Sequence, residues 1–155
     1  MDNNVVRRGG LRDISRILEI EQESFGPDSF SAAQFTYLIN HSKGAFLVVE
    51  NGGRILAYLS LLFHSRYNYL RIYSVAVSAQ SRGKGIGQLL MDEAFKIASD
   101  SGAKKITLEV MVTNRSAIAL YLKNGFKKCG IKPGYYHHGE DAFYMQRDML
   151  TANDA

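Results

Sequence analysis

The chain has 155 residues, the length of one ordinary domain built around a single hydrophobic core. Hydrophobic residues make up 46% of it and charged residues 22%, which excludes a wholly disordered chain. The formal net charge is +4 and the isoelectric point about 9.2, which suits an anionic ligand without identifying one.

Cysteine content and hydropathy indicate in which cellular compartment the protein is expected. The single cysteine, Cys129, excludes an intramolecular disulfide. The N-terminal residues lack the apolar segment of a signal peptide, and the longest nearly apolar stretch, residues 55–63, is too short to cross a bilayer. We therefore expect a cytoplasmic protein that does not bind membranes, with one domain over residues 1–155.

The first predicted elements are a short strand and two helices. Residues 5–8 (VVRR) suit a strand, and apolar spacing after Asp13 predicts an amphipathic helix that carries Ile14, Ile17, Leu18 and Phe25. The stretch GPDSFS at residues 26–31 interrupts this helix. Ser31 and Gln34 have the spacing of a capping box, which predicts a second short helix after Ser31.

Three strands and a long helix are predicted next. Strands at residues 44–50 and 54–63 flank an Asn-Gly-Gly turn, which favours a hairpin. A strand at residues 69–77 leads into a glycine-rich loop. Helical spacing then begins at Ile86 and stops near Gly102.

The last third of the chain completes a mixed pattern. A strand is predicted at residues 105–112, then a helix from Asn114 to Leu122, and then strands at 126–132 and 141–149. The order β-α-α-β-β-β-α-β-α-β-β predicts one layered α/β structure.

The glycine-rich loop, RGKGIG at residues 82–87, lies between a strand and a helix. It is not a P-loop, because Gly85 follows Lys84 where that motif needs Ser or Thr, and its glycine spacing fails the dinucleotide-binding fingerprint. Exposed amides at a helix N-terminus, with Arg82 and Lys84 beside them, would bind a pyrophosphate. The alternative is a flexible surface loop with solvated basic residues.

Three motifs together resemble one family. The loop, R-G-x-G-x-G after V-x-V, is similar to the acetyl-CoA loop of the GNAT superfamily of N-acetyltransferases. ITLEVMVTNRSAIALYLKNGF (106–126) and GYYHHGEDAFYM (134–145) resemble segments of its RimI-like protein N-terminal acetyltransferases. The resemblance implies an α/β (α+β) fold: a single GNAT domain with a mixed, mostly antiparallel twisted sheet, helices on both faces and splayed strands at the acetyl-CoA site.

The resemblance also implies an acetyl-CoA site without a metal. The pyrophosphate would lie on the loop amides, the strand before the loop would pair with the pantetheine and polarise the thioester, and an asparagine would contact CoA. These cofactor-binding residues are Arg82, Gly83, Lys84, Gly85, Ile86, Gly87, Val75, Ala76, Val77 and Asn114. Asn114 suits a helix N-cap equally well, and the side chains of residues 75–77 suit a buried strand.

Acid–base and substrate groups follow from the same motifs. Glu109 matches the family's general base and Tyr121 the tyrosine that protonates the thiolate, while Tyr135 and Tyr136 match a peptide groove. The alternatives are an exposed strand glutamate, a core tyrosine and an aromatic hairpin. An α-amine has a pKa near 7.7–8.0, about two to three units below that of a lysine side chain, so it demands a weaker base.

The resemblance predicts acetylation of a protein N-terminal α-amine, such as that of a ribosomal protein, by direct attack in a ternary complex. The absence of tryptophan departs from the Pro-Trp pair that bacterial RimI relatives often carry. Alternatives are acetylation of a small amine such as a polyamine or aminoglycoside, and a non-catalytic CoA-binding module. No RNA-binding signature is visible, so no direct contact with nucleic acid is expected, and the protein would be a monomer or homodimer.

Overall fold

The computed structural model describes residues 3–41 and 43–149. The chain divides into two compact units, which we describe separately. Unit 1 comprises Met1–Leu61 and Ser74–Leu90, and unit 2 comprises Leu62–Tyr73 and Met91–Ala155. Among the described residues, no helix is long and apolar enough to cross a membrane.

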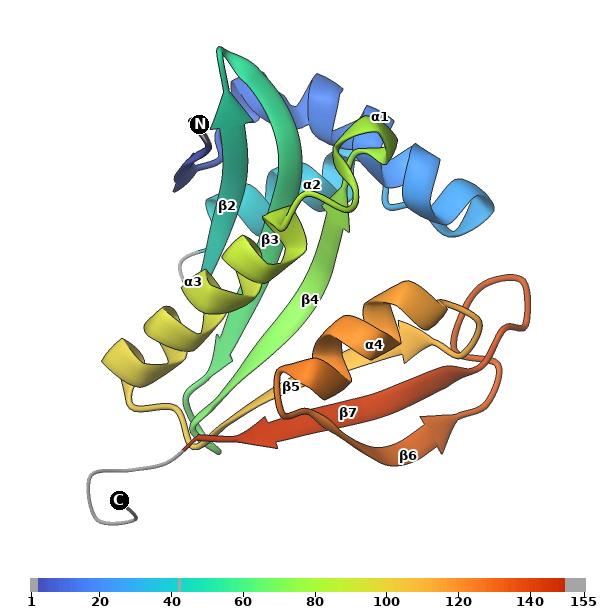
Figure 1. Ribbon diagram of the computed structural model, residues 1–155. Coiled ribbons are helices and arrows are strands. Elements are labelled where there is room, and N and C mark those ends of the chain that lie inside the picture. Colours follow the sequence, from blue (N-terminus) through green and yellow to red (C-terminus); the bar gives the residue numbers. More distant parts are fainter. Residues whose placement is uncertain (1–2, 42, 150–155) are drawn as a thin grey trace. The chain divides into compact units, whose positions relative to one another are not determined.

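The helices and strands follow the predicted order (Figure 1). In chain order they are β1 Val5–Arg8, α1 Ile14–Phe25, α2 Ala32–Asn40, β2 Gly44–Asn51, β3 Arg54–His64, β4 Tyr69–Val77, α3 Ile86–Ser101, β5 Lys105–Met111, α4 Arg115–Lys123, β6 Lys127–Lys132 and β7 Ala142–Asp148. The predicted α/β class is confirmed. That one domain spans residues 1–155 stays a prediction.

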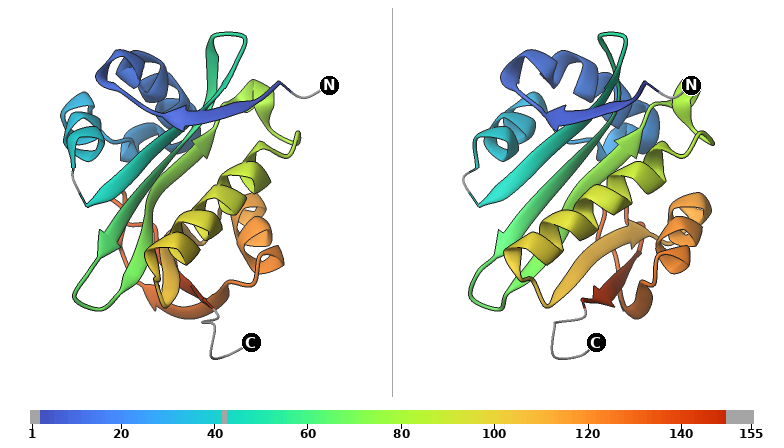
Figure 2. Two further views of the ribbon diagram at one scale, coloured as in Figure 1. Left: turned by 90° about the vertical axis from the view of Figure 1, so that its left-hand side faces the viewer. Right: turned by 60° about the vertical axis from the view of Figure 1, so that its left-hand side comes forward.

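The strands form a seven-stranded mixed sheet. The strand order is β1-β2-β3-β4 in unit 1 and β4-β5-β7-β6 in unit 2. The sheet is mixed because β4 and β5 are parallel, whereas the pairs β1–β2, β5–β7 and β6–β7 are antiparallel. Figure 2 shows from two further sides how β1 lies beside β2 at the edge of unit 1.

Local signals position the helices of unit 1. The predicted capping box is present: the Gln34 amide donates to Ser31 Oγ at 3.2 Å, and the Ser31 amide donates to Gln34 Oε1 at 2.8 Å. These bonds begin α2, which buries Phe35 edge-on against Tyr58 with ring centroids 5.4 Å apart. Aromatic packing therefore fixes α2 on the unit 1 core.

The buried side of α1 differs from the prediction. Ile17 is buried as expected, but its buried neighbours are Ile20 and Glu21, and Leu18 is only half-buried. The Glu21 carboxylate accepts hydrogen bonds from the Tyr58 hydroxyl and from the Phe30 amide, the latter at 2.8 Å. These partners satisfy a carboxyl group that the hydrophobic pattern assigned to solvent.

Strand β5 organises unit 2. It runs parallel to β4 from the Tyr69–Lys105 pair to the Ile72–Leu108 pair, and antiparallel to β7 on its other side. Its even-numbered side chains, Ile106, Leu108 and Val110, are buried and share one face of the sheet. Its odd-numbered side chains include Glu109, and they lie on the opposite face of the sheet.

The Glu21 network gives a testable pH dependence. Burial raises the pKa of Glu21, although the bonds from Tyr58 and Phe30 oppose the rise. The fold therefore favours the protonated carboxyl, and this contribution to stability is present below the unfolded pKa of about 4.3 and is lost as pH rises through the folded pKa. Urea unfolding should show wild-type protein losing free energy of unfolding relative to Glu21→Gln as pH rises above about 4.3.

Glu19→Gln is the matched control, because Glu19 lies on the same helix with 65% of its side chain exposed. Its stability curve should run parallel to that of the wild type. A wild type that gains stability relative to Glu21→Gln with rising pH would contradict the assignment.

Candidate active site

In unit 1, a sharp loop joins β4 to α3. The Ser78 amide donates to the Leu56 carbonyl at 2.8 Å, and this bond holds the end of β4. Gly83 and Gly85 then adopt positive φ values of 75° and 81°, in the left-handed region where a side chain would be strained. The third glycine of the motif, Gly87, instead lies inside α3.

The loop leads directly into the N-terminus of α3. The helix begins at Ile86, and the Leu89 amide makes its first backbone bond, to the Gly85 carbonyl at 3.1 Å. The amides of Ile86 and Gly87 lie in the first turn of this helix, at the positive end of its dipole. No heavy atom outside the immediate chain neighbours lies within 4 Å of a side-chain position at Gly83 or Gly85. Such an arrangement fits a phosphate group.

Arg82 has a different environment from Lys84. Its Nε donates to the Val77 carbonyl at 3.2 Å and its Nη2 to Ser24 Oγ at 3.1 Å, so its side chain ties the loop to β4 and α1. Lys84 is exposed. Ala76 is buried and Val75 half-buried. Arg82 is exposed as well, but its guanidinium is engaged in these two hydrogen bonds.

In unit 2, Glu109 is held by two cations. Its side chain is only 5% exposed. Arg71 reaches Oε1 through Nη2 at 2.8 Å and Nε at 3.0 Å, and Lys132 reaches Oε2 at 3.1 Å. The prediction treated Glu109 alone, so it missed both partners. Their signal in the sequence is weak, since each is one basic residue in a strand, and only the sheet register brings them to this carboxylate.

Arg71 also binds the loop between β6 and β7. Its Nη2 donates to the Tyr135 hydroxyl at 3.0 Å, and the Tyr135 and Tyr136 rings meet edge-on at 5.0 Å. Burial lowers the pKa of the Arg71 guanidinium, but Glu109, Tyr135 and Tyr73 together outweigh burial and raise it. Burial and then Glu109 raise the pKa of the Tyr135 phenol. Predicted groove residues thus lie beside the predicted base.

Tyr121 and Asn114 lie at opposite ends of α4. Tyr121 is 5% exposed and its ring lies 5.7 Å from that of Phe126. Burial raises the pKa of the Tyr121 phenol, with a smaller contribution from Tyr136, so the hydroxyl stays protonated at neutral pH. Asn114 is the helix N-cap, and its Oδ1 accepts from the Ala117 amide at 3.3 Å. The N-cap role is confirmed, and contact with CoA stays a prediction.

The Glu109 carboxylate retains capacity to accept a further hydrogen bond. A carboxylate oxygen has two acceptor positions; Oε1 accepts a hydrogen bond from Arg71 Nε and lies in ion-pair contact with Arg71 Nη2. Oε2 accepts from Lys132 and has one position left, which an ammonium group or a water molecule can fill. Among residues 3–41 and 43–149, no group of three His, Cys, Asp or Glu side chains is placed to hold a metal ion.

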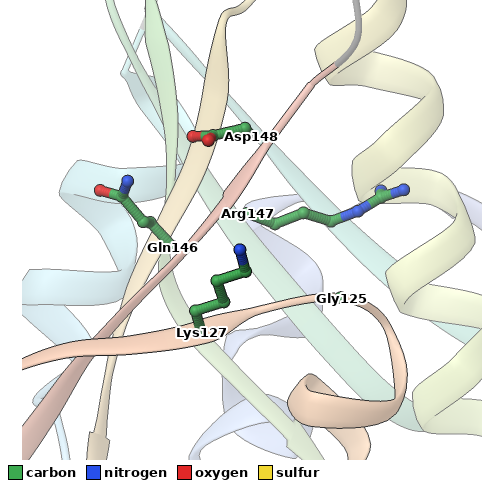
Figure 3. Close-up of a pocket in the computed structure, with 5 residues that line it drawn as sticks. All are labelled: Gly125, Lys127, Gln146, Arg147 and Asp148. Carbon is green, nitrogen blue, oxygen red and sulfur yellow. The ribbon is translucent and has the colours of Figure 1, made fainter.

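A separate pocket of about 200 Å³ lies near the end of α4 (Figure 3). The residues that line it are Gly125, Lys127, Gln146, Arg147 and Asp148. None of them is a predicted site residue. Gly125 has a φ of 86°, and a side chain there would come within 3.2 Å of Arg147 Nε, so close packing explains this glycine.

The ion pairs of Glu109 predict a stability effect. Arg71→Met should lower the free energy of unfolding by about 2–3 kcal/mol, because it removes one partner of a buried carboxylate. Glu109→Met in the same background should restore part of the loss, since no buried carboxylate remains and the Lys132 ammonium, 45% exposed, is solvated by water. Urea unfolding of the single and double variants measures both effects.

Arg66→Met is the control, because Arg66 is exposed and lies over the Tyr67 ring. It should change stability by less than about 0.5 kcal/mol. A double variant less stable than Arg71→Met would show that Arg71 and Glu109 do not stabilise each other.

Comparison with known proteins places the chain among acetyltransferases. The model of the Acetyltransferase (GNAT) family matches residues 12–126. A Bacillus subtilis protein provisionally named [ribosomal protein bS18]-alanine N-acetyltransferase is 30% identical over 150 residues, covering 96% of each chain. The N-alpha-acetyltransferase RimI of Mycobacterium tuberculosis is 29% identical over 154 residues, covering 95% of each chain.

A solved structure agrees with this assignment. The crystal structure of Ard1 from Thermoplasma volcanium matches with a TM-score of 0.91 at 27% identity, covering 97% of this chain and all of that one. The strand order, the glycine loop before α3 and the family match over residues 12–126 together lead to one conclusion. The chain belongs to the GNAT family of acetyltransferases and is an N-acetyltransferase of this type.

Proposed function

We propose that this enzyme transfers an acetyl group from acetyl-CoA to the α-amine of a protein N-terminus, by direct attack in a ternary complex. The observation that carries the proposal is the Glu109 carboxylate, which is buried and held by Arg71 and Lys132 yet keeps an acceptor position on Oε2. The names of the relatives from Bacillus subtilis and Mycobacterium tuberculosis support the same reaction class.

The loop of unit 1 would hold the cofactor. Amides from Arg82 to Gly87 would bind the pyrophosphate, with Lys84 adding charge. Backbone groups of residues 75–77 would bind the pantetheine and donate to the thioester oxygen, and Asn114 would contact CoA. Acetyl-CoA supplies the activated acyl group. A preorganised amide at the developing oxyanion contributes on the order of 100-fold in rate.

Side chains of unit 2 would move the protons. Glu109 Oε2 would accept a proton from the incoming ammonium, directly or through a water molecule. The Tyr121 hydroxyl, protonated at neutral pH, would donate a hydrogen bond to the leaving thiolate. Tyr135 and Tyr136 would contact the acceptor peptide, with rings for apolar contact and hydroxyls for its backbone.

The charge around Glu109 favours a protein N-terminus over a polycation. Two cations surround one carboxylate there, whereas a polyamine or aminoglycoside pocket would need an excess of acidic groups. About a tenth of an α-amine is already neutral at pH 7, against a few parts in ten thousand for lysine. A ribosomal protein as acceptor, a cytoplasmic location and a monomeric or homodimeric state stay predictions.

Mass spectrometry of one reaction tests this function. The protein is incubated with acetyl-CoA and a peptide that carries an N-terminal alanine and an internal lysine. We expect acetylation of the α-amine, reduced about 100-fold in kcat/KM by Glu109→Gln or Tyr121→Phe. Cys129→Ser is the control, because Cys129 is exposed on β6 and has no role in direct attack, so its activity should match the wild type.

The outcomes separate the alternatives. Acetylation of lysine alone would refute the substrate class, and loss of activity in Cys129→Ser would indicate a covalent acyl-cysteine instead of direct attack. Binding of CoA without acetylation of any amine would indicate a binding module.

A further inference from the structure

One face of the unit 2 sheet is polar and aromatic, whereas the other carries the buried side chains of Ile106, Leu108 and Val110. On β5 the polar face carries Lys105 and Glu109, and the register places Tyr144 of β7 opposite Glu109. Arg71 of β4 pairs with Thr107 and therefore shares this face. Figure 3 shows the same alternation on β7, where Gln146 and Arg147 leave the strand on opposite sides.

The polar face carries an excess of positive charge. Arg71, Lys105 and Lys132 lie on it, against Glu109 and Asp148, which pairs with Lys105 in the register. Tyrosine rings hold the two ammonium groups: Lys132 lies 5.5 Å from the Tyr135 ring and 5.2 Å from the Tyr144 ring, and Lys105 lies 5.7 Å from the Tyr69 ring. These contacts keep the cations on this face of the sheet.

From this surface we propose a specificity: the enzyme prefers protein N-termini with acidic residues directly after the acetylated amine. This inference rests on the proposed function, which places the acceptor amine at Glu109. Lys132 has three N–H donors, gives one to Glu109 and is 45% exposed, so it can bind a second carboxylate beside the first. A basic residue in that place would meet two like charges.

The spacing of the cations along the sheet determines which residues of the acceptor peptide they would contact. Lys105 lies four residues before Glu109 on β5, which corresponds to about 13 Å at 3.3 Å per residue. An extended acceptor covers that distance in about four residues. Lys132 would therefore act on the second residue of the acceptor and Lys105 on about the fifth.

A peptide suits this face better than a single-stranded nucleic acid. Both would use aromatic rings and cations. A phosphate backbone, however, would approach the Glu109 and Asp148 carboxylates at every nucleotide, whereas a peptide presents carboxylates only where its sequence has them. The presence of these two acidic groups therefore favours the peptide.

Three acceptor peptides test the specificity: Ala-Glu-Glu, Ala-Gln-Gln and Ala-Lys-Lys, each followed by the same neutral tail. We expect kcat/KM to fall in that order, by about tenfold between the acidic and the basic peptide, since each exposed charge contact changes affinity by about threefold. The ratio should shrink as NaCl is raised from 0.05 to about 0.5 M, because salt screens exposed charges.

Two variants locate the effect. For these, acidic residues are placed at positions 2 and 5 of the peptide. Lys105→Gln should lower the acidic-to-basic ratio of kcat/KM about threefold. Lys128→Gln removes the same charge from β6, but Lys128 lies 4.3 Å from the Phe143 ring, on the opposite face of the sheet, so its ratio should equal that of the wild type.

Equal kcat/KM for the three peptides, or preference for the basic one, would overturn the specificity and leave the proposed function intact. If a short single-stranded RNA inhibits the acetylation of all three peptides, the polar face binds nucleic acid, and this result would also overturn the proposed specificity. Acetylation of no peptide would overturn the proposed function and the specificity together.

Discussion

A carboxylate inside a sheet loses its water, and it is stable there only if charges and hydrogen bonds replace that water. Glu109 is in this position, with 5% of its side chain exposed. Arg71 from β4 and Lys132 from β6 provide the replacement, and Arg71 also binds Tyr135. One buried charge therefore fixes the positions of β4, β6 and the Tyr135 loop around Glu109 in unit 2. The same arrangement brings two cations to one hydrogen-bond acceptor, the Glu109 carboxylate.

The glycine loop of unit 1 differs from the Glu109 site. It presents backbone amides to an anion and uses no buried side-chain charge. Gly83 and Gly85 have the positive φ values that bring the chain from β4 into α3, and the first-turn amides of Ile86 and Gly87 lie at the positive end of the helix dipole. The Arg82 guanidinium donates hydrogen bonds to the Val77 carbonyl and to Ser24 Oγ. Backbone groups, with the charge of Lys84, thus remain for a phosphate.

Local sequence signals predicted the elements well, because caps, glycines and alternation act over a few residues. The Ser31–Gln34 capping box and the strand that follows α3 are both confirmed. Two features were missed. The burial of Glu21 depends on Tyr58, 37 residues away, and the pairing of Glu109 with Arg71 spans 38 residues. The first contact follows from the packing of α1 on β3 and the second from sheet register, neither of which single-residue patterns specify. The site roles came from resemblance and stay predictions.

The most direct test of the account is a crystal structure of this chain with a conjugate in which CoA is joined through an acetyl linker to the α-nitrogen of an alanyl peptide. The account predicts the pyrophosphate within hydrogen-bond distance of amides between Arg82 and Gly87. It also predicts the α-nitrogen within reach of Glu109 Oε2, directly or through one water molecule, with the Arg71 and Lys132 contacts retained. A pyrophosphate bound away from these amides, or a peptide nitrogen with no path to Glu109, would contradict it.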